Sequence, residues 1–136
     1  MFSKMEILLC SSSMCKNMDM LSLAFVGDAV HTLFIRERII KDNNLKMDSA
    51  NKLASKFCRA SAQAKTLEAI LPALTEEEQE IVRKTRNIKN KHKAKNTDTM
   101  TYKYATCYEA LVGYCYMENK IGRLNFLLYA SLEGEI

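Results

Sequence analysis

The sequence predicts an all-α protein of one domain, and three observations support this prediction. Gly and Pro, the residues that most often interrupt regular structure, occur only four times and once in 136 residues. Apolar residues recur at helical spacing over several long segments, which is typical of amphipathic or buried helices. Hydrophobic residues make up 48% of the chain, and a chain of this length can bury a core of its own.

The first expected helix contains the most apolar stretch of the chain. The segment 21–37 reads LSLAFVGDAVHTLFIRE and leaves little polar face when it is wound as a helix. A helix that is apolar on all sides is usually buried, so we expect this one to lie in the core. Asp19 or Ser22 can cap its N-terminus, and the helix should run to about Lys41.

The following helices are predicted from caps, breaks and apolar stripes. Asp48 can cap a second long helix, whose polar residues, Gln63 among them, fall mostly on other faces, and Pro72 ends it or marks the next turn. Thr75 and Glu78 have the spacing of a capping box, so a short helix should start there. The helices expected after the first one cover about 49–71, 75–85, 99–118 and 121–132.

Two apolar segments each carry one acidic residue in their middle and one glycine. Asp28 follows Gly27 in the first segment, and Glu109 precedes Gly113 by one turn in the segment 104–118, which reads YATCYEALVGYCYME. Glycine inside a helix costs about 1 kcal/mol relative to alanine, and it often allows a second backbone to come close. These features suggest that the two helices cross closely and that their carboxylates converge.

The two acids have two interpretations. An unpaired carboxylate in an apolar interior is costly, so each side chain must be neutralised or held by a partner, and a metal ion is one such partner. Alternatively, Asp28 and Glu109 are satisfied separately, by local hydrogen bonds or by Arg and Lys side chains. The residue pattern alone leaves both interpretations open.

The segment 83–95 is the most basic part of the chain. It reads RKTRNIKNKHKAK and contains seven Lys or Arg residues, one His and no acidic residue. It is either a solvated surface segment or a phosphate-binding segment, because so many uncompensated cations create a strong local field. The candidate phosphate contacts are Arg83, Lys84, Arg86, Lys89, Lys95 and Lys103.

The cysteines and the N-terminal residues bear on the cellular compartment. The five cysteines are odd in number and form no C-x-x-C pair, so reduced thiols are expected rather than disulfides or zinc ligands. Residues 1–18 lack the apolar core of a signal peptide and are expected to be an extension of a single domain that covers 19–136. No segment approaches the roughly 18 consecutive apolar residues of a membrane span. We therefore expect a cytoplasmic location.

Several of these motifs together resemble those of a known enzyme family. The segment LAFVGDAVHTLFIRE resembles the signature of ribonuclease III domains, in which Gly-Asp-Ala or Gly-Asp-Ser follows an aliphatic–aromatic run. The ordered occurrence of FVGDAV, the basic R-N-x-K segment, KNTD and YEALVGY is more specifically similar to Mini-ribonuclease III, the short form with the catalytic domain alone. The resemblance extends from about Leu21 to about Leu128.

The resemblance implies an all-helical ribonuclease III-like endonuclease domain that works as a homodimer and has no double-stranded-RNA-binding domain. It implies an endoribonuclease that needs a divalent metal, Mg²⁺, and cleaves double-stranded RNA, with precursor 23S ribosomal RNA as the substrate of the subfamily. The signature Asp corresponds to Asp28 and the Glu of the E-A-L-x-G motif to Glu109, which implies that both are catalytic residues and metal ligands. Whether a ribosomal protein presents the RNA stays open.

Two positions depart from the pattern of the larger ribonuclease III enzymes. Four residues before Asp28 those enzymes carry a Glu, and this chain has Ala24. Three residues before Glu109 they carry an Asp, and this chain has Thr106. Both replacements fit the Mini type, and they leave fewer carboxylates around the metal ions.

Two other functions are compatible with the pattern. A ribonuclease III-like fold could hold structured RNA without cutting it, although a decayed site would be free to lose Asp28 or Glu109, and both are present. A helical interaction module with a solubilising basic surface would not explain why an acidic residue interrupts each of the two apolar segments. Binding of Mg²⁺ separates the enzyme from both alternatives.

Overall fold

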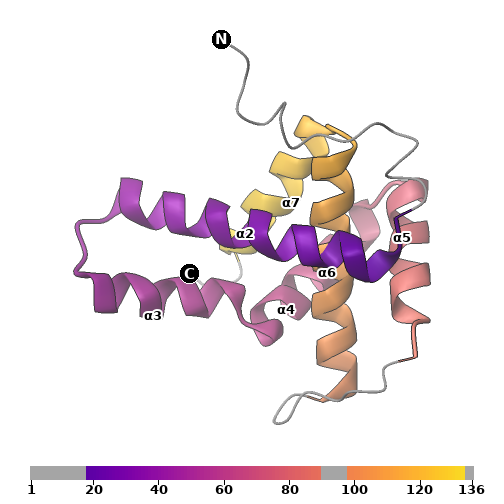
Figure 1. The fold of residues 1–136 in the computed structure, drawn as a ribbon, viewed down its shortest axis with the longest axis horizontal. Helices are drawn as coiled ribbons and strands as arrows, with labels where there is room; N and C mark the ends of the chain where they lie inside the picture. Colours follow the sequence, from indigo (N-terminus) through magenta and orange to yellow (C-terminus); the bar gives the residue numbers. More distant parts are fainter. Residues whose placement is uncertain (1–17, 90–97, 134–136) are drawn as a thin grey trace.

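The computed structural model describes residues 18–89 and 98–133, and every regular element in these ranges is a helix (Figure 1). The prediction of an all-α fold is therefore confirmed. The elements are α2 (Met20–Asp42), α3 (Met47–Cys58), α4 (Ala60–Ile70), the short 3-10 helix η1 (Leu71–Ala73), α5 (Glu76–Arg86), α6 (Thr99–Met117) and α7 (Ile121–Glu133).

Helix α6 forms the centre of the molecule. Its residues are buried on nearly every side between positions 105 and 116, and α2, α4, α5 and α7 all pack against it (Figure 1). Tyr108 is completely buried, and its hydroxyl donates a hydrogen bond to the carbonyl oxygen of Leu127 on α7 (2.9 Å). The helix begins after Asp98, whose carboxylate accepts a hydrogen bond from the backbone N–H of Thr101 (2.8 Å).

Helix α2 crosses α6 steeply and is buried along only one side (Figure 1). Leu23 and Ile35 are completely or almost completely buried, whereas Phe25 is 81% exposed and Ile40 is 61% exposed. The prediction that this segment is buried on all sides is therefore wrong for the single chain, because its neighbours cover one face. Asp19 caps the helix as expected, since its carboxylate accepts a hydrogen bond from the backbone N–H of Ser22 (2.7 Å).

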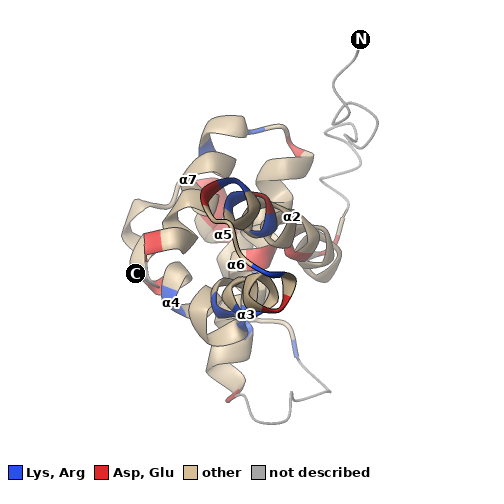
Figure 2. Ribbon diagram, turned by 90° about the vertical axis from the view of Figure 1, so that its left-hand side faces the viewer, with Lys and Arg blue, Asp and Glu red and all other residues tan. Residues whose placement is uncertain are grey.

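The second half of α2 pairs with α3 in a hairpin that has its own small core. The buried centre of this core consists of Ile35, Ile39, Ala50 and Ala54. Figure 2 looks onto the hairpin and shows acidic and basic residues mixed on its surface. Arg38 and Asp42, for example, form an ion pair (3.3 Å).

The single long helix expected over 49–71 is in fact two helices. The backbone is extended at Arg59 (φ −69°, ψ 156°), which ends α3 and starts α4, and its carbonyl oxygen accepts hydrogen bonds from Ala62 and Gln63. The break lets α4 pack on α6 while α3 stays against α2. The expected N-cap, Asp48, lies in the first turn of α3, which begins one residue earlier.

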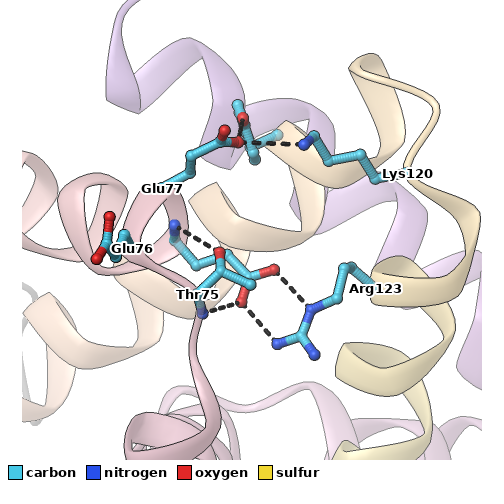
Figure 3. Close-up of a pocket in the computed structure, with 7 residues that line it drawn as sticks. Thr75, Glu76, Glu77, Lys120 and Arg123 are labelled. Atoms are coloured by element: carbon cyan, nitrogen blue, oxygen red, sulfur yellow. Dashed lines mark hydrogen bonds and ion pairs between the residues drawn. The ribbon is translucent and has the colours of Figure 1, made fainter.

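The predicted capping box at the start of α5 is confirmed. Glu78 donates its backbone N–H to the Thr75 hydroxyl (3.1 Å), and Thr75 donates its N–H to the Glu78 carboxylate (3.0 Å). Glu78 is 2% exposed, and Arg123 of α7 donates two hydrogen bonds to its carboxylate (2.8 and 2.7 Å; Figure 3). Burial raises the pKa of Glu78, but its bonds to Arg123 and Thr75 outweigh this and hold the pKa below its usual value. The ion pair anchors α7 to the first turn of α5.

The described ranges contain three of the cysteines. Cys58, Cys107 and Cys115 are free thiols. Cys10 and Cys15 lie outside the described residues. Within residues 18–89 and 98–133, no helix combines the length and the hydropathy that a bilayer crossing requires.

Candidate active site

Helices α2 and α6 touch through their two glycines. A Cβ atom placed on Gly27 would overlap the backbone carbonyl oxygen of Glu109 and would lie 2.8 Å from the nitrogen of Gly113. A Cβ atom on Gly113 would overlap the carbonyl oxygen of Leu23 and would lie 3.1 Å from the nitrogen of Gly27. No side chain fits at either position without moving the backbones apart. The close crossing expected from the two glycines is therefore present.

Asp28 and Glu109 come together at this crossing. Asp28 follows Gly27 on α2, Glu109 lies one turn before Gly113 on α6, and the two carboxyl groups are hydrogen-bonded to each other. Asp28 is exposed and Glu109 is half-buried, so the pair lies at the protein surface and not in an apolar interior. The interpretation in which the two acids are satisfied separately does not fit this arrangement.

The surroundings of Glu109 change the pKa of its carboxyl group. Burial, together with the hydrogen bond and charge of Asp28, raises the pKa of Glu109 to about 8, while a hydrogen bond from Gln63 opposes the shift. A carboxyl group with this pKa is protonated at neutral pH when no cation is bound. Among the described residues, no Lys or Arg forms an ion pair with either acid. Two adjacent carboxylates without a basic partner form a site that a bound cation would stabilise.

Comparison with known proteins agrees with this geometry. The profile of the ribonuclease III domain matches residues 21–120. The Mini-ribonuclease 3 of Thermoanaerobacter sp. (strain X514) is 40% identical over 113 residues, which are 83% of this chain and 80% of that protein. The protein of the same name from Symbiobacterium thermophilum is 38% identical over 113 residues, which are 83% of this chain and 87% of that protein. The chain belongs to the Mini-ribonuclease III family.

A solved structure agrees with this family assignment. The crystal structure of a protein from Fusobacterium nucleatum superposes with a TM-score of 0.79 at 28% sequence identity, over 88% of this chain and 96% of that chain. The fold is thus that of the ribonuclease III domain, and the chain is an endoribonuclease, a hydrolase of RNA.

Enzymes of the ribonuclease III family generally depend on a divalent metal ion, and the carboxylate pair fits such an ion. Mg²⁺ prefers hard oxygen ligands and keeps several waters, so one or two protein carboxylates suffice. The described residues contain no cluster of three or more His, Cys, Asp and Glu side chains. Ala24 is buried, and the hydroxyl of Thr106 donates to the carbonyl oxygen of Tyr102 (2.8 Å), so neither adds a ligand. Among the described residues, Asp28 and Glu109 are therefore the adjacent carboxylates that could hold such an ion.

Gln63 is a neighbour of this pair that the sequence interpretation missed. It was expected on a polar face of its helix, but it is 2% exposed and its side chain hydrogen-bonds to Glu109. The break at Arg59 changes which face of α4 points inward, and apolar periodicity that continues across the break gives no sign of it. His31 is completely buried, and its Nδ1 atom lies 3.1 Å from Nε2 of the Gln63 amide.

Thr32 and Arg36 lie near the Cys58 thiol, on which Asp28 and Glu109 also act. Burial raises the pKa of the Cys58 thiol, a hydrogen bond with Thr32 opposes this, and the charges of Asp28, Arg36 and Glu109 also act on the thiol. These side chains therefore surround the junction of α2, α3 and α6. Thr32 and Arg36 follow Asp28 by one and two helical turns, and this spacing was a signal that could have placed them on the same face.

Arg86 and Lys103 are the two predicted RNA contacts that the structure brings into one neighbourhood. Burial raises the pKa of Cys107 to about 11, and the positive charges of Arg86 and Lys103 both oppose this shift. The two cations therefore lie near the same thiol, one on α5 and one on α6. Lys103 is half-buried and Arg86 is exposed.

The other predicted RNA contacts differ in their surroundings. Arg83 forms an ion pair with Glu80 within α5, which reduces the charge that it offers to a phosphate. Lys84 and Lys89 are exposed to solvent. Lys95 lies outside the described residues. The first turns of the basic segment, up to Arg86, belong to α5 and so have a fixed orientation.

Proposed function

We propose that this chain cleaves double-stranded RNA with Asp28 and Glu109 as its catalytic residues and Mg²⁺ ligands, and that it matures the ends of precursor 23S ribosomal RNA. The observation that carries the proposal is the convergence of the two carboxyl groups at the α2–α6 crossing. Similar proteins from Thermoanaerobacter sp. and Brevibacillus brevis bear the name Mini-ribonuclease 3, which supports the reaction class.

The chemistry needs two ionised ligands. Asp28 is exposed and can receive substrate and solvent, whereas Glu109 is half-buried and holds a proton with a pKa of about 8 in the absence of a cation. Glu109 gives up this proton when an ion binds, because a ligand carboxylate must be ionised. Bound Mg²⁺ supplies an activated water and neutralises charge on the phosphate. The backbone contact at Gly27 keeps the two carboxylates at a fixed separation.

The basic residues hold the RNA backbone. Double-stranded RNA is recognised mainly through its shape, phosphates and 2′-hydroxyl groups, so cations are suitable contacts and sequence preference should be loose. Arg86 and Lys103 lie on α5 and α6, and α6 also carries Glu109, so they can position a phosphate relative to the carboxylate pair. Lys84 on α5 and Lys89 just after it are exposed, and we include both, together with Lys95 of the same basic segment, among the proposed RNA contacts.

The exposed apolar side of α2 suits a homodimer. Phe25 is 81% exposed and Leu33 is 55% exposed. Both line an apolar hollow, whose lining also includes Asp28, Val30 and Met117. Large apolar side chains in one surface patch often mark an association site. A two-fold dimer through this surface would bring two carboxylate pairs to one duplex, one for each strand.

The proposal is tested with an end-labelled RNA hairpin that has a long stem. Purified protein is incubated with it in Mg²⁺ or in EDTA, beside a single-stranded RNA and a DNA duplex of the same sequence. We expect cleavage only of the RNA stem and only with Mg²⁺. A transcript of the terminal stem of precursor 23S RNA should be cut at defined positions, and faster than an unrelated duplex of equal length.

Two results would decide against parts of the proposal. Retention of the duplex without cleavage under all metal conditions would support the alternative of a non-catalytic RNA-binding protein. Equal cleavage of the 23S stem and the unrelated duplex would remove the assignment of the natural substrate and leave the reaction itself. If cleavage of the 23S stem improves on addition of a ribosomal protein, that protein presents the RNA.

A further inference from the structure

A buried amide and a buried imidazole connect three helices next to the carboxylate pair. Gln63 of α4 is 2% exposed, and His31 of α2 is completely buried. The Gln63 Nε2 atom lies 3.1 Å from His31 Nδ1, and the Gln63 side chain also hydrogen-bonds to Glu109 of α6. Gln63 therefore bridges a buried ring on one side and a carboxyl group on the other.

The direction of these hydrogen bonds follows from the chemistry of the groups. Burial lowers the pKa of His31 to about 4, against the opposing charge of Asp28, so the ring is neutral at neutral pH. A neutral imidazole accepts through one nitrogen and donates through the other. The Gln63 Nε2 atom carries two hydrogens, so it can donate one to His31 Nδ1 and the other to the Glu109 carboxylate. This assignment puts the ring proton of His31 on Nε2.

The arrangement at His31 costs stability. Its Nε2 atom is buried and has no hydrogen-bond partner among the described residues. An apolar side chain of similar size would avoid an unsatisfied buried donor. The ring is held edge-on to Tyr108, with the ring centroids 5.1 Å apart, so it cannot turn freely to exchange its two nitrogens. The protein keeps this histidine in spite of its unsatisfied Nε2 atom, which suggests that the orientation of the Gln63 amide contributes to function.

We propose that Gln63 is a positioning residue for the metal ligand Glu109, and that His31 fixes the Gln63 amide so that its second N–H points at the carboxylate. The proposal rests on the proposed function of Asp28 and Glu109 as metal ligands. Groups that orient a ligand from behind it commonly change metal affinity by 10- to 100-fold when they are removed.

The test uses Mn²⁺ as a paramagnetic probe, and its binding to the full-length protein is followed by electron paramagnetic resonance. Gln63→Met keeps the length of the side chain and removes both hydrogen bonds. Thr66→Val is the matched control, because Thr66 is also buried on α4, but its hydroxyl bonds only to the Ala62 carbonyl oxygen of the same helix (3.1 Å). We expect Gln63→Met to weaken Mn²⁺ binding by about 10-fold and Thr66→Val to leave it within 2-fold of wild type.

Two variants of His31 show whether the histidine acts through Gln63. His31→Leu removes the acceptor and should weaken Mn²⁺ binding in the same direction as Gln63→Met. His31→Asn offers an amide oxygen as a replacement acceptor and should restore part of the affinity. In the Gln63→Met background, His31→Leu should have no further effect on Mn²⁺ affinity, since residues in one network are not additive. Melting temperatures measured on all variants separate loss of folding from loss of affinity.

The outcomes distinguish this inference from the proposed function. If wild-type protein binds Mn²⁺, Asp28→Asn abolishes binding, and folded Gln63→Met binds as wild type does, the positioning role of Gln63 is wrong and the metal site remains. Should Gln63→Met fail to fold, wild-type Mn²⁺ affinity in folded His31→Leu would overturn the positioning role in the same way. If wild type shows no Mn²⁺ binding that depends on Asp28, both the proposed function and this inference are overturned.

Discussion

At the scale of single residues, Glu109 determines how the site responds to pH. Its carboxyl group faces Asp28 of α2, the Cys58 thiol of α3 and the Gln63 amide of α4. The folded protein raises the pKa of Glu109 from 4.5 to about 8, so the folded state holds this proton more tightly than the unfolded chain does. Stability contributed by this group is therefore present below about pH 4.5 and is lost as the pH rises towards 8.

This gives a prediction for the metal-free protein. In EDTA, the difference in melting temperature between Glu109→Gln and wild type should grow in favour of the variant as the pH rises from 5 to about 8. Burial lowers the pKa of His31 to about 4, so His31 makes the protein more stable as the pH rises, which is the opposite of the Glu109 effect. This His31 contribution is the same in wild type and Glu109→Gln, so it cancels when the two melting temperatures are compared. Saturating Mg²⁺ should reverse the order by stabilising wild type. A difference that does not change with pH would show that Glu109 ionises as an ordinary carboxyl group.

Single residues also show how far sequence reasoning reaches. The convergence of Asp28 and Glu109 was one of the two interpretations that the sequence allowed, because each acid interrupts an apolar segment that also carries a glycine. The burial of Gln63 was not, because it depends on the direction that α4 takes after Arg59. The exposure of Asp28 was also missed, since an apolar pattern does not show which side of a helix its neighbours leave uncovered.

At the scale of helices, the contact between α2 and α6 fixes the site. Gly27→Ala should lower the free energy of unfolding by about 3 kcal/mol, because the new Cβ atom must separate two backbones in direct contact. Gly122→Ala is the matched control. Gly122 has no atom within 4 Å of an added Cβ, and it lies inside α7, so alanine should stabilise the protein by about 0.5 kcal/mol. Urea denaturation measures both values, and a Gly27→Ala protein as stable as wild type would contradict the close crossing.

The helices also show which structural signals are local. The α5 capping box and the Asp19 cap of α2 were readable because each depends on residues three positions apart. The break at Arg59 carries no Gly or Pro and arises from packing, since α3 must follow α2 while α4 must follow α6. The bond between Glu78 and Arg123 joins α5 to α7 across 45 positions, and no spacing rule predicts such a pair.

At the scale of the whole molecule, the exposed side of α2 should control association. Phe25→Asp should convert the expected dimer into a monomer in sedimentation equilibrium, because a charge replaces an 81% exposed aromatic side chain at the proposed interface. Met100→Asp is the control, since Met100 is 51% exposed but lies at the start of α6, away from the hollow lined by Phe25. A wild-type protein that stays monomeric at high concentration would contradict the proposed dimer.

The distribution of charge over the molecule leads to a prediction for RNA affinity. Arg86→Gln or Lys103→Gln should weaken binding about equally for several duplex sequences, and each should flatten the log–log salt dependence by ~1, because each contact releases about one counterion. Lys120→Gln is the control, since Lys120 is already paired with Glu77 (3.1 Å) on another part of the molecule. Fluorescence anisotropy at several salt concentrations measures this, and a loss restricted to one RNA sequence would contradict backbone recognition.

The most direct test of the proposed metal site is the single-turnover rate of hairpin cleavage at saturating protein and Mg²⁺. Asp28→Asn and Glu109→Gln remove one charge each at this site, and Glu68→Gln removes one from an exposed position on α4. We predict that the first two variants lose at least ~100-fold in rate, since bound metal contributes several kcal/mol to the reaction, and that Glu68→Gln keeps the wild-type rate. Folded Asp28→Asn and Glu109→Gln proteins that cleave as fast as Glu68→Gln would show that the reaction occurs elsewhere.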